Sequence, residues 1–231
     1  MTEADILTDR REYGDALERI DVLQSGGQRH VAALRLAMRA RRGLGDWGGL
    51  LRVVRLLQKH RALTPEQAAP VRRQAHMGAL HDIDPAELDA YWKSLPSVER
   101  EDAQVVRAMC EALVAAGQFV QARKLIEAQI ERGWESSLMT LYAHSDGADA
   151  LARIGRAEAW LRDHPDDGEL LLALGRLCRT QQLWGKAQSY LEAALAVQPS
   201  RIVYVELALL AEHLERPEDA QAHFRAAALM K

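Results

Sequence analysis

The residues of this 231-residue chain that could do chemistry are chiefly eight histidines, two cysteines and one glycine-rich segment. The histidines do not form the H-x-x-x-H or H-E-x-x-H spacing that binds zinc on one helix face, and no C-x-x-C-H haem-attachment motif is present. We interpret them as surface or turn residues, while a single imidazole would suffice as an axial haem ligand. Cys110 and Cys178 lie within apolar helical patterns, which indicates buried thiols in a reducing compartment rather than a disulfide.

The glycine-rich segment Gly43–Gly48 matches the pattern G-x-G-x-x-G. That pattern binds a dinucleotide when a strand precedes it, whereas Val31 to Arg42 has a basic helical pattern. No serine lies in G-x-S-x-G, so a hydrolase nucleophile elbow is absent from the sequence. Acidic clusters at 99–102 and 163–167 fall at predicted helix starts, where carboxylates cap free amides. We therefore predict no catalytic residues, no metal site and no enzyme activity.

Composition, net charge and hydropathy exclude several further classes of protein. Hydrophobic residues make up 48% of the chain and the net charge is −3, which argues against a dedicated nucleic-acid binder. Alanine, leucine, arginine and glutamate, which favour helices, dominate the composition. No apolar run approaches the roughly 20 residues of a transmembrane helix, and the N-terminus lacks the features of a signal peptide.

An internal repeat organises the chain. Within 168–199, Leu171, Leu174, Gly175, Cys178, Ala187, Leu191 and Pro199 match the tetratricopeptide pattern W-x2-L-G-x2-Y…A-x3-F…P, with substitutes at several places. A residue that is usually small, followed four positions later by a large apolar one, recurs at steps of 30 to 38 residues: Ala16/Ile20, Leu50/Val54, Leu88/Trp92, Ala122/Ile126, Ala157/Leu161, Ala187/Leu191 and Ala220/Phe224. This phase predicts an all-α solenoid of about six antiparallel helix pairs, coiled into a right-handed superhelix.

Two halves are predicted within the solenoid. Residues 1–133 form N-terminal tetratricopeptide-like repeats, the first of them truncated, because a full partner helix does not fit before Ala16. Residues 134–231 form C-terminal repeats that continue the first half. The stretch from Trp134 to Asp149, which contains Ser145-Asp146-Gly147, has the weakest pattern, and we expect a short or distorted helix there.

The first helix of each pair lines the concave surface of such a solenoid. Taking the phase from the small positions, the inward-facing residues are rich in arginine, and the predicted partner-binding groove contains Arg35, Arg39, Arg42, Arg73, Arg107, Glu111, Arg176, Arg179 and Glu212. Guanidinium groups suit carboxylates and phosphates, so an acidic segment of a partner, a C-terminal carboxylate or porphyrin propionates would fit. The alternative is that these arginines are ordinary solvated surface, paired with nearby glutamates.

Several motifs, in this order, resemble the proteobacterial HemY family. They are Gly45-Asp46-Trp47-Gly48-Gly49-Leu50-Leu51, Tyr91-Trp92-Lys93, Leu174-Gly175-Arg176-Leu177, Leu183-Trp184-Gly185-Lys186-Ala187 and Arg216-Pro217-Glu218-Asp219-Ala220. The resemblance covers most of the chain and is weakest over the first thirty or so residues. It implies an inner-membrane protein in which two transmembrane helices precede a repeat domain, associated with late protohaem biosynthesis and without an established catalytic mechanism. Those membrane helices are missing from this sequence.

Two functions follow as expectations. The first is a non-catalytic scaffold that docks a protein partner, such as an enzyme of the haem pathway, in the arginine-lined groove. The alternative is a carrier that binds haem or a porphyrin directly; otherwise no cofactor and no nucleic-acid partner is expected. The resemblance implies that the full-length protein is anchored in the bacterial inner membrane, and we expect the repeat domain on its cytoplasmic side.

Overall fold

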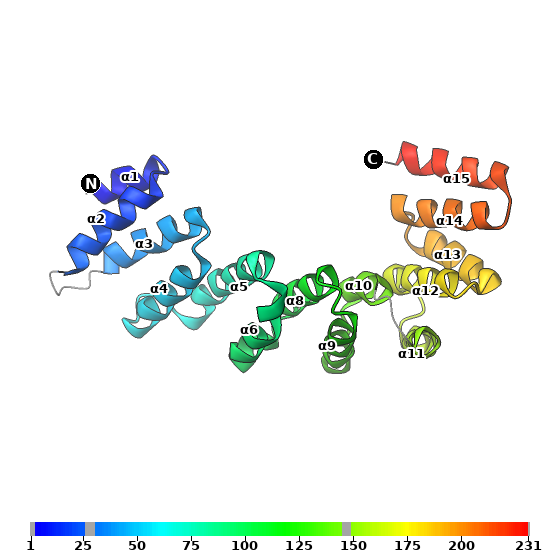
Figure 1. Ribbon diagram of the computed structural model, residues 1–231, viewed down its shortest axis with the longest axis horizontal. Helices are drawn as coiled ribbons and strands as arrows, with labels where there is room; N and C mark the ends of the chain where they lie inside the picture. The colour runs from blue at the N-terminus through cyan, green and yellow to red at the C-terminus, as the bar shows by residue number, and fades with distance from the viewer. Residues whose placement is uncertain (1–2, 26–30, 145–148, 231) are drawn as a thin grey trace. The chain divides into compact units, whose positions relative to one another are not determined.

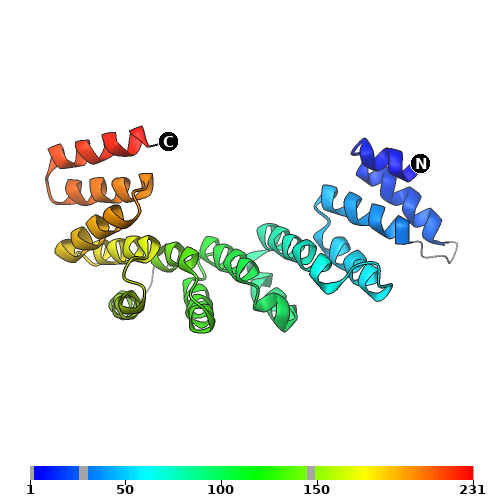
Figure 2. The same ribbon diagram turned by 180° about the vertical axis from the view of Figure 1, so that it is seen from behind.

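The computed structural model describes residues 3–25, 31–144 and 149–230, and all regular secondary structure in these ranges is helical. Fifteen α-helices and two short 3-10 helices occur in these ranges, with no strand among them. Consecutive helices pack in pairs, such as α3 with α4, α12 with α13 and α14 with α15 (Figure 1). The same pairing is visible from behind in Figure 2. The predicted all-α helical repeat is confirmed.

The chain forms two compact units, Met1–Ala112 and Leu113–Lys231. The domain boundary expected after residue 133 remains a prediction. The elements of the first unit are α1 (Glu3–Asp9), α2 (Tyr13–Ser25), α3 (Val31–Leu44), α4 (Trp47–Lys59), α5 (Pro65–Asp82), η1 (Pro85–Glu87), α6 (Leu88–Ser94), α7 (Ser97–Arg100) and most of α8 (Ala103–Ala115). Helix α1 has seven residues, about half the length of its partner α2.

The second unit holds α9 (Phe119–Arg132), η2 (Ser136–Leu138), α10 (Met139–His144), α11 (Ala150–Asp163), α12 (Gly168–Thr180), α13 (Trp184–Val197), α14 (Arg201–His213) and α15 (Pro217–Leu229). The short helix expected between Trp134 and Asp149 is α10, which has six residues. The Ser145-Asp146-Gly147 segment of that expectation lies outside the described residues. None of the helices in the described ranges has the length and apolar character needed to cross a membrane.

Side-chain caps and glycine turns set the helix limits. Asp167 and Ser200 accept hydrogen bonds from the third amide of α12 and α14 respectively, which satisfies donors that the helix itself leaves open. Thr64 and Gln67 form a reciprocal capping box at the start of α5. Gly45 and Gly117 have φ values of +70°, the left-handed conformation that glycine adopts at least cost, and both lie in turns that join two helices.

The repeat phase read from the sequence coincides with the core. The first member of every small/large pair lies in a second helix and has at most 4% of its surface exposed, and these residues are Ala16, Leu50, Leu88, Ala122, Ala157, Ala187 and Ala220. Gly175 shows why a small residue is also needed in a first helix. A Cβ atom there would lie 2.6 Å from Cγ and Cδ2 of Leu191, so α12 and α13 approach closely only because that atom is missing.

Candidate partner-binding surface

Helix α3 presents its arginines to solvent. Ala32, Arg35, Arg39 and Arg42 recur at helical spacing and are all exposed, while Leu34 and Ala37 on the other side are buried. Helical periodicity thus divides α3 into an apolar stripe that packs and a basic stripe that faces water. We call Arg35, Arg39 and Arg42 the α3 arginine stripe. Its solvent-facing position is the geometry that an anion-binding surface requires.

The three guanidinium groups of the α3 arginine stripe have few partners. Arg35 donates to the carbonyl oxygen of Ala62 over 3.4 Å. Arg39 pairs with Asp9 of α1 at 2.8 Å, and both side chains are more than half exposed, so water weakens the attraction. Arg42 forms no ion pair with any residue that the structure describes. A carboxylate that binds these arginines would therefore have to break few existing contacts.

Arg73 and Arg107, also predicted in the groove, are already paired. Arg73 of α5 holds Asp102 through Nε, which lies 2.7 Å from Oδ2, and through Nη2, which lies 2.6 Å from the same oxygen. Arg107 and Glu111 form a pair one helical turn apart in α8, with Nε 2.9 Å from Oε1 and both side chains about half exposed. These residues fit the alternative interpretation of arginines neutralised by nearby acidic groups.

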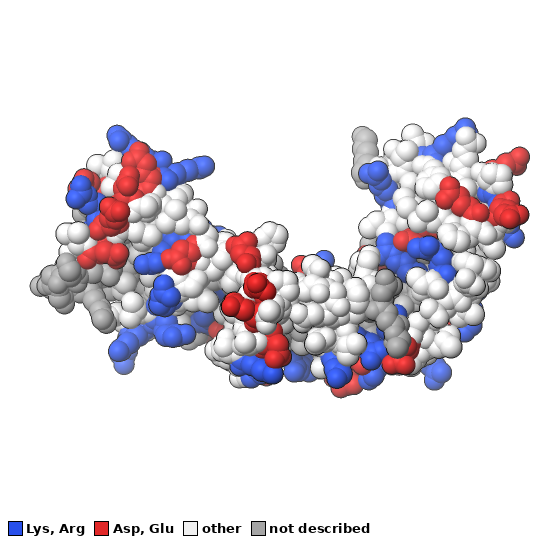
Figure 3. Space-filling model, in the orientation of Figure 1, with Lys and Arg blue, Asp and Glu red and all other residues white. Residues whose placement is uncertain are grey.

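Arg176 and Arg179 of α12 share one carboxylate. Arg176 Nε lies 2.8 Å from Oε1 of Glu206 in α14, and Arg179 Nη2 lies 3.2 Å from its Oε2. Only 9% of the Glu206 side chain is exposed, so the pairing is electrostatically strong and costly to dissolve. Figure 3 shows basic side chains gathered beside acidic ones over the region of α12 to α14. These two predicted groove arginines thus take part in a contact between neighbouring repeats.

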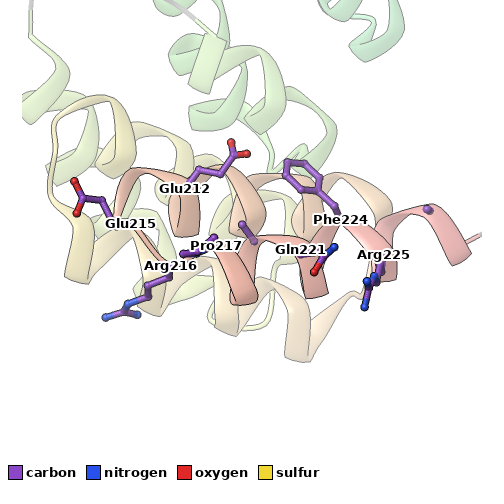
Figure 4. Close-up of a pocket in the computed structure, with 9 residues that line it drawn as sticks. Glu212, Glu215, Arg216, Pro217, Gln221, Phe224 and Arg225 are labelled. Carbon is purple, nitrogen blue, oxygen red and sulfur yellow. The ribbon is translucent and has the colours of Figure 1, made fainter.

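Glu212, at the end of α14, lies beside an open hollow of about 820 Å³ that is lined mainly by α15 and the turn before it. Glu215 and Arg216 in the turn and Phe224 of α15 contribute to its lining. Figure 4 shows these side chains from the end of α14 through the turn and along α15. Glu212 is exposed and pairs with no cation among the described residues, so of the predicted groove residues it and the α3 arginine stripe are the most available to a partner.

The acidic residues that pair with groove arginines of the preceding repeat were not predicted. Asp102 follows Arg73 by 29 residues, and Glu206 follows Arg176 by 30, which is close to one repeat length. An acidic residue about one repeat after a groove arginine is a signal that the sequence contained. This signal identifies an ion pair only when the shift between neighbouring first helices is known, because that shift decides which side chains meet.

The comparisons with known proteins identify a relative. No protein-family model matches the chain. Over 219 residues the chain is 25% identical to protein HemY of Escherichia coli K12, an alignment that covers 92% of this chain and 54% of HemY. The chain is a distant homologue of HemY. Protein HemY of Shigella flexneri matches with the same identity and coverage. The chain spans about half the length of the HemY proteins that it matches.

Among the histidines that the structure describes, the most buried one has a structural partner. His76 is 4% exposed, and its Nδ1 lies 2.9 Å from the hydroxyl of Tyr91. Burial lowers the pKa of His76 and raises that of Tyr91 to about 12, so both are neutral at physiological pH. His164 stacks on Trp134 with ring centroids 3.9 Å apart. In the described ranges, no three His, Cys, Asp or Glu residues gather where a metal ion could bind.

Proposed function

We propose that this HemY homologue is a non-catalytic scaffold in late protohaem biosynthesis that docks a protein partner. Its full-length form would be tethered to the inner membrane, with the repeats on the cytoplasmic side. The observation that carries the docking proposal is the α3 arginine stripe, which is exposed and only weakly paired. The haem association comes from the resemblance to the HemY family.

The chemistry of the α3 arginine stripe favours an acidic ligand. Arg35, Arg39 and Arg42 project from one face of a single helix, so their spacing is held by the backbone rather than by a loop. Each guanidinium group can donate two parallel hydrogen bonds to one carboxylate. An acidic segment of a partner would therefore gain several charge-assisted hydrogen bonds on a rigid surface. The partner that we propose is an enzyme of the haem pathway with such a segment.

A charge-reversal experiment tests the docking proposal. The purified chain, immobilised, is used to capture proteins from detergent-solubilised native membranes, and the captured proteins are identified by mass spectrometry. The variant Arg35→Glu, Arg39→Glu, Arg42→Glu is expected to lose the haem-pathway enzyme while its helicity by circular dichroism is kept. The matched control changes Arg55, Lys59 and Arg100, which are also exposed, to Glu. Capture that survives the stripe variant, or is lost equally in the control, would show that the stripe is not the docking site.

The carrier alternative has a separate optical test. Hemin is titrated into the chain and the Soret band is followed. Saturable binding of one hemin per chain that disappears on a single histidine substitution would establish a tetrapyrrole carrier and replace the scaffold proposal. Unsaturated, featureless partition is the outcome expected of a scaffold.

A further inference from the structure

Three first helices carry an arginine as their ninth residue, and the arginine of α3 is paired differently from the other two. The three residues are Arg39 of α3, Arg73 of α5 and Arg176 of α12. Arg73 and Arg176 each pair with a largely buried carboxylate that follows about one repeat later. Arg39 pairs in the opposite direction, with Asp9 at the end of α1, and both of those side chains are more than half exposed.

Among the described residues, the side of α3 that faces α5 lacks the carboxylate found in the other two repeats. The two helices are neighbours. Arg35 donates to the carbonyl oxygen of Ala62, just before α5, and Met38 packs against a core cluster that contains Ala68 of α5. No acidic side chain within α5, all of which is described, pairs with the α3 arginine stripe. A carboxylate at this place is therefore a group that another molecule can supply.

The exposed surface of α5 beside this place is largely apolar. Pro70 and Met77 lie three residues before and four residues after Arg73, so the three side chains share one face of α5. Pro70 is exposed, and Met77 is 41% exposed. Arg73, which lies between them, is already neutralised by Asp102. The flexible thioether of an exposed methionine adapts to apolar partners of different shapes, so this face suits apolar rather than charged groups.

We call the surface made by the α3 arginine stripe together with Pro70 and Met77 the α3–α5 face. Its spacing suits an extended peptide. Arg35 and Arg39 are four residues apart, which is about 6 Å along a helix. Side chains two residues apart in an extended chain point the same way and are about 6.7 Å apart. Alternate carboxylates of such a peptide can face successive arginines, while the side chains between them point the opposite way, toward α5.

We propose that the α3–α5 face binds an extended acidic segment of a partner protein in which large apolar residues alternate with carboxylates. The site rests on the docking function proposed above and defines the segment that the α3 arginine stripe recognises. The carboxylates of the segment take the place that acidic residues of the following repeat fill elsewhere in the chain. Its apolar side chains cover Pro70 and Met77. Asp9 competes with the segment for Arg39 and thereby limits the affinity.

Designed peptides test the nature of the segment. The probe is a short fluorescein-labelled peptide in which leucine alternates with aspartate, and its binding to the full chain is measured by fluorescence anisotropy at low ionic strength. One control peptide has lysine in place of every aspartate, and the other has serine in place of every leucine. The probe should bind at least about tenfold more tightly than either control, because each control lacks either the charge-assisted hydrogen bonds or the apolar contact.

Variants of the chain test the place of binding. Asp9→Asn frees Arg39 and should raise the affinity for the probe about two- to fivefold, which is the range expected for an exposed ion pair. Its matched control is Asp21→Asn, which removes the same charge from an exposed residue of α2 and should change nothing. Met77→Ser should weaken the probe about fivefold and leave the leucine-free peptide unaffected. Its matched control is Val98→Ser, at an exposed apolar residue of α7, which should bind the probe normally.

The outcomes separate this inference from the docking proposal. Aspartate-dependent binding that neither Asp9→Asn nor Met77→Ser alters would overturn the inference, while the α3 arginine stripe kept its role in docking. A probe that binds no better than the lysine peptide would also overturn it, even if capture of the haem-pathway enzyme still depended on the stripe. Self-association in sedimentation that the charge-reversed stripe variant abolishes would overturn it as well, because the occupant would then be a second copy of the chain.

Discussion

Arg73 holds both carboxylate oxygens of Asp102 through its Nε, at 3.0 Å from Oδ1 and 2.7 Å from Oδ2. The same carboxylate accepts hydrogen bonds from the backbone amides of Gln104 and Val105 at the start of α8. One side chain therefore caps a helix and ties it to the first helix of the preceding repeat. Two kinds of contact with separate energies depend on Asp102.

Substitution of Asp102 should separate these contacts. Asp102→Asn keeps an oxygen for the cap and loses the ion pair with Arg73, so we expect a loss of about 1 kcal/mol in the free energy of unfolding. Asp102→Ala loses both contacts and should cost about 2 kcal/mol. Urea denaturation of the two variants at pH 7 measures the difference. Equal losses would mean that the cap contributes nothing.

The Asp102 contribution should also depend on pH. Burial alone would raise the pKa of Asp102, but hydrogen bonds from Arg73 and from the α8 amides outweigh burial, and the net pKa lies below 3.8. The unfolded state then binds the proton more readily, so the stabilisation is complete above the unfolded pKa and is lost as the pH falls through the folded pKa. Urea titrations from pH 7 to pH 3 should show the parent approaching Asp102→Asn in stability. A constant gap would contradict this.

Two glycine substitutions should have opposite signs. Gly175→Ala places a Cβ atom against Leu191, so we expect a loss of about 1 to 3 kcal/mol from overpacking. Gly155 in α11 is exposed and has open space around it, so Gly155→Ala should raise stability by about 0.5 to 1 kcal/mol through a better helix propensity. Thermal denaturation by circular dichroism compares the two variants with the parent. A stabilising Gly175→Ala would show that α12 and α13 have room to separate.

Removal of the carboxylate between the two α12 arginines should be costly. Glu206→Gln leaves Arg176 and Arg179 close together without a counter-charge, and we expect a loss of about 3 to 5 kcal/mol. The triple variant Arg176→Met, Glu206→Leu, Arg179→Met should recover most of that loss, because apolar side chains of similar size need no counter-charge. Urea denaturation measures both. A triple variant as unstable as Glu206→Gln would show that the ion pairs themselves stabilise the contact between α12 and α14.

The two thiols should resist modification in the native state. Cys110 and Cys178 are fully buried, and burial raises their pKa values to about 12 and about 11. Since the thiolate is the reactive form, Ellman's reagent at pH 8 should modify neither cysteine over several minutes. Both should react at once in concentrated urea. Rapid reaction of the native chain would mean that one of the helices opens readily.

The sequence was sufficient to predict helix pairing but not the contacts between repeats. A small residue four positions before a large one identifies the second helices, because both residues belong to one helix and their burial follows from its periodicity. The exposure of Arg35, Arg39 and Arg42 could be predicted for the same reason. The ion pair between Arg176 and Glu206 could not be predicted in this way. It joins two helices whose residues are 30 positions apart, and it depends on how far one repeat is shifted against the next. The stacking of His164 on Trp134 is likewise a contact between separate elements.

The double use of helix-capping carboxylates has a consequence for how the chain opens. Asp167 caps α12 and also accepts hydrogen bonds from Trp134 Nε1 and Ser136 Oγ, just as Asp102 serves both α8 and Arg73. A helix end normally frays by itself, with little effect on its neighbours. Here, fraying of the first turn of α12 would also break the hydrogen bonds that Trp134 and Ser136 donate to Asp167. Amide hydrogens in the first turn of α12 and around Trp134 should therefore exchange with deuterium together, as one cooperative opening that extends beyond a single repeat.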